Sequence, residues 1–73
     1  MLSFGLHKKF GDHIRHLRKQ KDWTQETLGE KANLDWRYVG DVERGEKSPT
    51  LETIRKLAKA LKISLAELFS SFK

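Results

Sequence analysis

The sequence contains no cysteine and only one proline among its 73 residues. Without cysteine, a disulfide framework, a thiolate zinc site and a thiol nucleophile are all excluded. The absence also favours a reducing compartment, so we expect a cytoplasmic location. No apolar run approaches the roughly 18 residues of a membrane span, and the amino end lacks the continuous apolar core of a signal peptide. We therefore expect neither a membrane segment nor a secreted scaffold.

Signals of catalysis are lacking as well. The chain has no Gly-rich phosphate loop, no HExxH pattern and no isolated acid pair in an apolar setting. His13 and His16 share one face of an expected helix, but only His7 or Asp12 offers a third ligand, so we expect no metal site. A deep pocket is difficult to build in so short a chain. The sequence thus predicts no enzyme, no cofactor and no small-molecule ligand.

Positive charge is what the chain has in excess. Its 15 Lys and Arg against 10 Asp and Glu give a formal net charge of +5. Residues 1–23 carry six basic and two acidic side chains and residues 50–73 carry five and two, whereas residues 24–49 carry four and six. A basic balance favours polyanionic partners, nucleic acid before anionic membrane surfaces. A surface for such a partner must therefore draw on both ends of the chain.

Helical periodicity dominates the sequence and predicts five helices. Phe10, Ile14 and Leu17 form one apolar stripe on a first helix over about residues 6–21. The capping and turn residues that separate the later helices are Thr24, Asn33, Asp35, Gly45, Thr50 and Ser64, the last in a capping box with Glu67. The expected inner faces of the later helices are made by Leu28, the stem of Lys31, Ala32, Tyr38, Val39, Val42, Leu51, Ile54, Leu57, Ala58, Leu61 and Leu68. No linker or repeat interrupts the pattern, so we expect a single domain over residues 1–73.

Residues 24–43 fit a helix-turn-helix, in which two short helices are joined by a turn and face each other through apolar side chains. Such a motif holds its second helix rigidly while one face stays free to enter a major groove about 12 Å wide. The outer face is expected to consist of Trp36, Arg37, Gly40 and Asp41. The pattern alone is not specific, because any three-helix bundle has similar apolar stripes.

The combination of motifs is more specific. From residue 24 to residue 69 the chain reads TQETLGEKANLDWRYVGDVERGEKSPTLETIRKLAKALKISLAELF. Together with the preceding helix, this string resembles the Xre/Cro-like helix-turn-helix family, which includes phage repressors and controller proteins of restriction-modification systems. The resemblance implies an all-α, compact five-helix bundle of the lambda-repressor-like DNA-binding type, with helices two and three forming the helix-turn-helix. It also implies a sequence-specific transcriptional regulator that binds double-stranded DNA as a homodimer on a two-fold symmetric operator.

Two residues depart from the family pattern. Gly29 stands where these proteins usually have alanine, and Asn33 stands where they usually have glycine. We expect Gly29 to loosen the second helix by up to about 1 kcal/mol relative to alanine, whereas Asn33 keeps a left-handed turn feasible.

The resemblance also implies roles for individual residues. Thr24 and Gln25 match the start of the second helix, which meets a phosphate and braces the recognition helix. The positions that face bases match Trp36, Arg37 and Asp41, of which Arg37 suits guanine and Asp41 suits cytosine. The positions that meet the phosphate backbone match Tyr38, Arg44, Lys47 and Ser48. An ion pair between the first helix and the end of the third matches Arg18 and Glu43.

Plainer roles stay open for several of these residues. Arg37 and Asp41 could form only an exposed ion pair, worth a few tenths of a kcal/mol. Trp36 could touch a thymine methyl, pack over a sugar or lie against the neighbouring helix. Asp35 is expected to cap the third helix rather than to read DNA.

The carboxyl end has more apolar side chains than one short helix can bury inside so small a domain. We expect Leu68 to point inward, while a two-fold interface is formed by Leu65, Phe69 and Phe72, extended by Met1, Leu2 and Phe4. In the alternative interpretation, Phe69 covers the core of its own subunit. The dimer hypothesis thus depends on which of these side chains are left exposed.

Three other functions stay open at this point. A protein-interaction adaptor would keep its partner at high salt, whereas a DNA-binding protein loses affinity steeply. A membrane-surface peptide would require anionic lipid. An antitoxin-like autoregulator would share both the fold and the DNA contacts of the favoured class.

Overall fold

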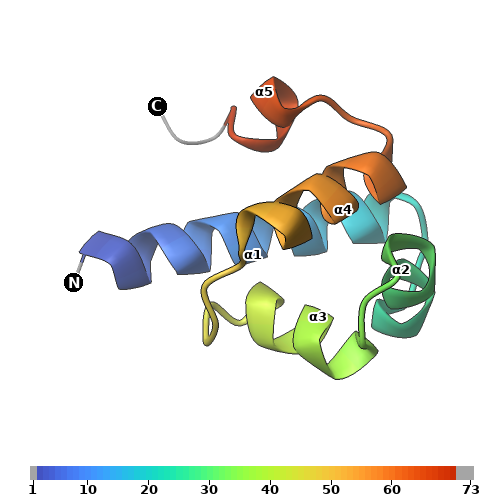
Figure 1. The fold of residues 1–73 in the computed structure, drawn as a ribbon, viewed down its shortest axis with the longest axis horizontal. Helices are drawn as coiled ribbons and strands as arrows, with labels where there is room; N and C mark the ends of the chain where they lie inside the picture. Colours follow the sequence, from blue (N-terminus) through green and yellow to red (C-terminus); the bar gives the residue numbers. More distant parts are fainter. Residues whose placement is uncertain (1, 71–73) are drawn as a thin grey trace.

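A computed structural model describes the backbone of residues 2–70 and the side chains from residue 5 onward. Its five helices are α1 (Leu2–Gln20), α2 (Gln25–Ala32), α3 (Trp36–Glu43), α4 (Leu51–Leu61) and α5 (Leu65–Leu68). The described residues contain no strand, so the predicted all-α, five-helix architecture is confirmed. In Figure 1, α3 and α5 lie on opposite sides of α1 and α4. No helix in this part of the chain is both long and apolar enough to cross a membrane.

The first helix is longer than its apolar stripe predicts. It begins at Leu2 instead of near residue 6, and Gly5 lies within it without ending it. A glycine in a helix interior costs only about 1 kcal/mol relative to alanine, which the rest of the helix can offset. At the other end, Asp22 adopts a left-handed conformation with φ 58°, and the Trp23 amide donates to the Arg18 carbonyl. The chain therefore leaves α1 in a tight turn directly before α2.

The predicted caps of the later helices are confirmed. The side chains of Thr24, Asp35, Thr50 and Ser64 each accept a hydrogen bond from a first-turn backbone amide. Ser64 and Glu67 form the complete capping box that the sequence predicts. Three of the turns that follow helices use left-handed backbone at Asn33, Gly45 and Lys62. Local sequence signals thus fix where α2 to α5 begin.

The core is apolar and is shared by all five helices. Its buried side chains are Phe10, Ile14, Leu28, Ala32, Val39, Val42, Leu57, Ala58, Leu61 and Leu68. Leu68 is fully buried, as predicted, and so connects α5 to the bundle. Two predictions were wrong: Leu51 is 85% exposed, and Lys31 lies on the surface with its ammonium over the Trp23 ring. Thr53 takes the inward position at the start of α4 instead.

Two glycines allow α1 and α3 to approach closely. A Cβ atom at Gly11 would lie 2.2 Å from the Val42 carbonyl oxygen and 2.5 Å from that of Glu43. Gly45, just beyond α3, has φ +75°, and a Cβ there would lie 2.9 Å from the Lys8 Cα. The end of α3 therefore rests directly on the backbone of α1.

Gly29 makes a similar close approach at the turn of the helix-turn-helix. A Cβ at this position would lie 2.7 Å from the Leu34 carbonyl oxygen and 3.2 Å from the Trp36 Cα. The Gly29 carbonyl accepts a 2.7 Å hydrogen bond from the Leu34 amide, which closes the turn around left-handed Asn33. Alanine at this position would require the Leu34 carbonyl to shift, which offsets the gain in helix propensity that alanine would bring.

Candidate nucleic-acid interface

The second and third helices present one open face. Trp36 is 46% exposed, and the Arg37 side chain is 74% exposed, at the amino end of α3. Val39 and Val42 face the opposite way and are buried. One side of α3 is thus free to meet a partner while the other is packed into the domain.

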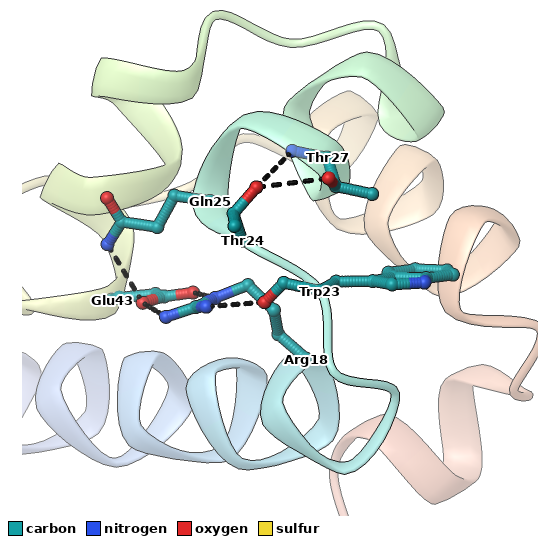
Figure 2. Close-up of polar contacts among 6 residues, drawn as sticks. All are labelled: Arg18, Trp23, Thr24, Gln25, Thr27 and Glu43. Atoms are coloured by element: carbon teal, nitrogen blue, oxygen red, sulfur yellow. Dashed lines mark hydrogen bonds and ion pairs between the residues drawn. The ribbon is translucent and has the colours of Figure 1, made fainter.

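The buried side of α3 is held by an ion pair. The Arg18 guanidinium donates from Nε to Glu43 Oε2 at 2.7 Å and from Nη2 to Glu43 Oε1 at 3.0 Å. The side chains are only 9% and 3% exposed. These are the two residues that the family resemblance pairs, and Figure 2 shows their planar groups edge to edge. The end of α3 is therefore connected to α1 by a bidentate contact shielded from solvent.

Two further groups complete this contact, as Figure 2 shows. Arg18 Nη1 donates to the Trp23 carbonyl oxygen at 2.8 Å, and Gln25 Nε2 donates to Glu43 Oε1 at 3.1 Å. We call Arg18, Trp23, Gln25 and Glu43 the buried polar cluster. It joins α1, the loop after it, the start of α2 and the end of α3. The sequence offered no signal for the Trp23 carbonyl, since a backbone acceptor has no residue preference.

At the exposed amino end of α3, Arg37 pairs with Asp35 and not with Asp41. Arg37 Nε lies 3.2 Å from Asp35 Oδ1, and Nη2 lies 3.1 Å from Oδ2. The Arg37 amide also donates to Asp35 Oδ1 at 2.8 Å, and the guanidinium lies 5.8 Å from the Trp36 ring centroid. The side-chain hydrogen bond from Arg37 lowers the pKa of Asp35, and the same bond raises the pKa of Arg37. The alternative interpretation of Arg37 and Asp41 as partners was therefore wrong.

Asp41 is engaged at the other end of α3. Its carboxylate pairs with the Arg44 guanidinium and lies 3.5 Å from Lys47 Nζ, while Arg44 also contacts Glu46 at 3.2 Å. Charges of both signs are thus interleaved where α3 passes into the next loop. This arrangement leaves Asp41 less free than Arg37 to approach a base.

The other expected contact residues lie in different settings. Tyr38 packs against the core and its hydroxyl lies 3.2 Å from Thr53 Oγ1, so its ring faces α4. Thr24 serves as the α2 cap, with its hydroxyl 3.0 Å from that of Thr27. Gly40 is buried beside the side chains of Gln25 and Arg44, so its expected outward position was wrong.

A second surface, apolar in character, lies where α1, α4 and α5 meet. A hollow of about 280 Å³ is lined by Leu6, His7, Phe10, Ser48, Pro49, Ile54 and Phe69. Phe69 is 36% exposed and stacks on Phe10 with ring centroids 5.7 Å apart, and Leu65 is 52% exposed. Phe72 and Met1 lie outside the described residues, as do the side chains of Leu2 and Phe4. Within residues 2–70, no three His, Asp or Glu side chains gather as a metal site would require.

These features define a helix-turn-helix DNA-binding domain: α2 and α3 are paired, one face of α3 is open, and the Arg18–Glu43 ion pair holds its buried side. A helix-turn-helix family model matches residues 14–68. The chain therefore belongs to the Xre-like helix-turn-helix family of transcriptional regulators.

Individual relatives agree with this assignment. The control protein C.MunI of a Mycoplasma species is 36% identical over 63 residues, which is 85% of each chain. The immunity repressor of Bacillus phage phi105 is 40% identical over 58 residues, and the match spans 40% of that longer protein. Among solved structures, the restriction-modification controller protein C.AhdI from Aeromonas hydrophila has a TM-score of 0.86 and 48% identity, over 89% of this chain and 98% of that chain. The lambda-repressor-like fold class is thus confirmed.

Proposed function

We propose that this protein is a sequence-specific transcriptional regulator that binds double-stranded DNA as a homodimer on a two-fold symmetric operator. Residues 1–73 form one domain in this proposal, with the helix-turn-helix over residues 24–43. The observation that carries it is the single open face of α3, with Arg37 exposed and Glu43 fixed behind it. Bound at a promoter, the dimer occludes polymerase or recruits it. The family of the relatives supports the DNA-binding part of the proposal.

Each residue has a role in this proposal. Arg37 reads a guanine, and Trp36 covers its guanidinium and faces the groove. Asp41 faces a cytosine only when it releases Arg44 and Lys47. The phosphate backbone is met by Thr24, Gln25, Tyr38, Arg44, Lys47 and Ser48.

The homodimer is supported by the apolar surface. Phe69 lines the hollow and is 36% exposed, and Leu65, four positions earlier, is 52% exposed, so both leave apolar surface that a second subunit can cover. Burying each side chain contributes roughly 1.5–3 kcal/mol, so a few per subunit are enough for micromolar association. We therefore place Leu65, Phe69 and Phe72 in a two-fold interface.

Selection of bound duplexes from a random pool tests the function as a whole. A two-fold symmetric consensus is expected, with one guanine per half-site at the position that Arg37 meets. A pool that shows no enrichment would contradict sequence-specific binding, and an asymmetric consensus would contradict the homodimer. A protein partner that stays bound to this chain at high salt would instead indicate a protein-interaction adaptor.

Replacement of Arg37 tests the base contact. Arg37→Ala is expected to cost about 1–3 kcal/mol on the selected site and to relax discrimination at one base pair per half-site. Lys47→Ala is the comparison, because loss of a phosphate contact weakens all sequences similarly. Titration against single-base operator variants measures both effects. A uniform loss for Arg37→Ala would reduce Arg37 to a phosphate contact.

Replacement of Leu65 tests the dimer. Leu65→Ser removes a half-exposed side chain without opening the core, so the subunit is expected to fold while association weakens by at least about tenfold. Ala66→Ser, an exposed position on the same helix, is the control and is expected to leave association unchanged. Sedimentation over a concentration series measures the equilibrium. A wild-type protein that stays monomeric at high micromolar concentration would remove the interface.

A further inference from the structure

Asp35 is the cap residue that differs in kind from the others. The described caps of α2, α4 and α5 are the hydroxyl residues Thr24, Thr50 and Ser64, whereas α3 is capped by a carboxylate. Serine caps a helix about as well as aspartate does. A carboxylate at the end of the helix that faces DNA is repelled by phosphates, so capping alone does not account for this choice.

The contacts of Asp35 point to a second task. Both of its carboxylate oxygens are used: Oδ1 accepts from the Arg37 amide and Nε, and Oδ2 accepts from Nη2. The indole of Trp36 lies beside the same guanidinium. Arg37 is therefore held at three points although its side chain is 74% exposed. Exposed arginines otherwise lose substantial side-chain entropy when they bind a partner.

Asp35 binds one edge of the Arg37 guanidinium, so the other edge stays available for a second partner. A guanidinium has five N–H donors in one plane. Asp35 takes Nε and one hydrogen of Nη2, so both hydrogens of Nη1 and the second hydrogen of Nη2 stay available. The parallel Nη1 and Nη2 donors that remain match the O6 and N7 acceptors of guanine in the major groove.

We propose that Asp35 is a specificity-determining positioning residue, which holds the Arg37 guanidinium with its Nη1/Nη2 edge directed at guanine and does not itself touch the base. This inference rests on the proposed function, because it requires Arg37 to face the operator. Affinity for DNA in general and discrimination between bases usually change together, but Asp35 changes them in opposite directions. Asp35 weakens binding to every duplex through charge repulsion, yet it sharpens the choice of base at one position.

The test compares Asp35→Ser with the matched control Glu52→Ser. Serine keeps the cap of α3 but removes the carboxylate from Arg37. Glu52 makes the same kind of contact with Arg55 on α4, with Nη2 2.7 Å from Oε2 and both side chains about 60% exposed. Affinities are measured at one salt concentration on three duplexes: the selected operator, its variant with the Arg37 guanine replaced in both half-sites, and an unrelated duplex.

For Asp35→Ser we expect equal or tighter binding to the unrelated duplex. The ratio of affinities for the operator and its substituted variant is expected to fall at least about threefold, within the range that one bidentate base contact supplies. Glu52→Ser is expected to leave that ratio unchanged. In an Arg37→Ala background, Asp35→Ser should no longer alter the ratio, because the residue through which it acts is gone. Thermal unfolding of each variant checks that the cap is retained.

The outcomes separate this inference from the proposed function. If Arg37→Ala leaves the ratio unchanged, Arg37 does not read the base and the proposed contact fails. If Arg37→Ala lowers the ratio but Asp35→Ser does not, only the positioning role of Asp35 fails. A higher ratio in Asp35→Ser would mean that Asp35 holds Arg37 away from the base, which also overturns the inference. Should Asp35→Ser unfold, Asp35→Asn serves in its place, since asparagine caps equally well without the charge.

Discussion

Gly11→Ala is expected to destabilise the protein by at least about 3 kcal/mol, the upper range for an overpacked site. The added Cβ would lie within 2.7 Å of three backbone atoms of Val42 and Glu43, none of which can rotate away. Relief requires α1 and α3 to separate, which also strains the buried polar cluster. A domain of this size is stable by only roughly 4–11 kcal/mol, so much of its stability would be lost. Denaturant unfolding measures the change.

Gly5→Ala provides the internal control for that experiment. Gly5 lies in the same helix, but nothing stands within 4 Å of a Cβ at its position. Alanine there is expected to stabilise the protein by about 0.5–1 kcal/mol through helix propensity alone. Opposite signs for the two substitutions would locate the contact at Gly11, whereas a mild effect at Gly11 would mean that the helices are not so close.

Removal of one partner of the Arg18–Glu43 pair is the second large effect. Arg18→Met leaves the Glu43 carboxylate buried with only the Gln25 amide as a hydrogen-bond donor, and we expect a loss of about 3–5 kcal/mol. Glu43→Gln leaves the Arg18 charge buried without a counter-charge, with the Trp23 carbonyl and the single amide oxygen of the new side chain as acceptors, and is expected to cost a similar amount. Chemical unfolding of each variant provides the numbers.

The double variant distinguishes the free-energy cost of an unpaired buried charge from the cost of lost packing. Arg18→Met with Glu43→Gln removes both charges, and we expect the double variant to lose clearly less stability than the sum of the two single losses. Lys8→Met is the exposed control, because Lys8 and Asp12 are each at least half exposed and such a pair contributes under about 1 kcal/mol. Additive small losses at Arg18 and Glu43 would show that the pair is not a structural brace.

Local signals explain what the sequence predicted well. The four caps could be assigned because a cap side chain bonds an amide within its own first turn, so both partners are adjacent in sequence. The inward position of Leu68 followed from helical spacing for the same reason. Leu51 was predicted inward although it opens α4, where spacing alone does not tell which side of the first turn faces the core.

Contacts between distant segments required information that local patterns lack. The ion pair of Arg18 and Glu43 spans 25 positions, and only the family resemblance indicated it. The close approach at Gly11 depends on how α3 crosses α1, which no spacing rule specifies. Arg37 pairs with Asp35 because the α3 cap places this carboxylate beside its guanidinium. Asp41 instead pairs with Arg44 and Lys47. An acidic cap two positions before an arginine is the signal that would have identified this pair.

The guanidinium of Arg18 binds both the carbonyl directly before the helix-turn-helix and the carboxylate at its end. One side chain thus closes residues 23–43 into a ring that neither α2 nor α3 can leave separately. Opening of either helix breaks the same buried contact, so the two helices share one opening free energy. We therefore expect α2 and α3 to exchange their amide hydrogens together and slowly, and we expect α5, connected to the core mainly through Leu68, to open on its own.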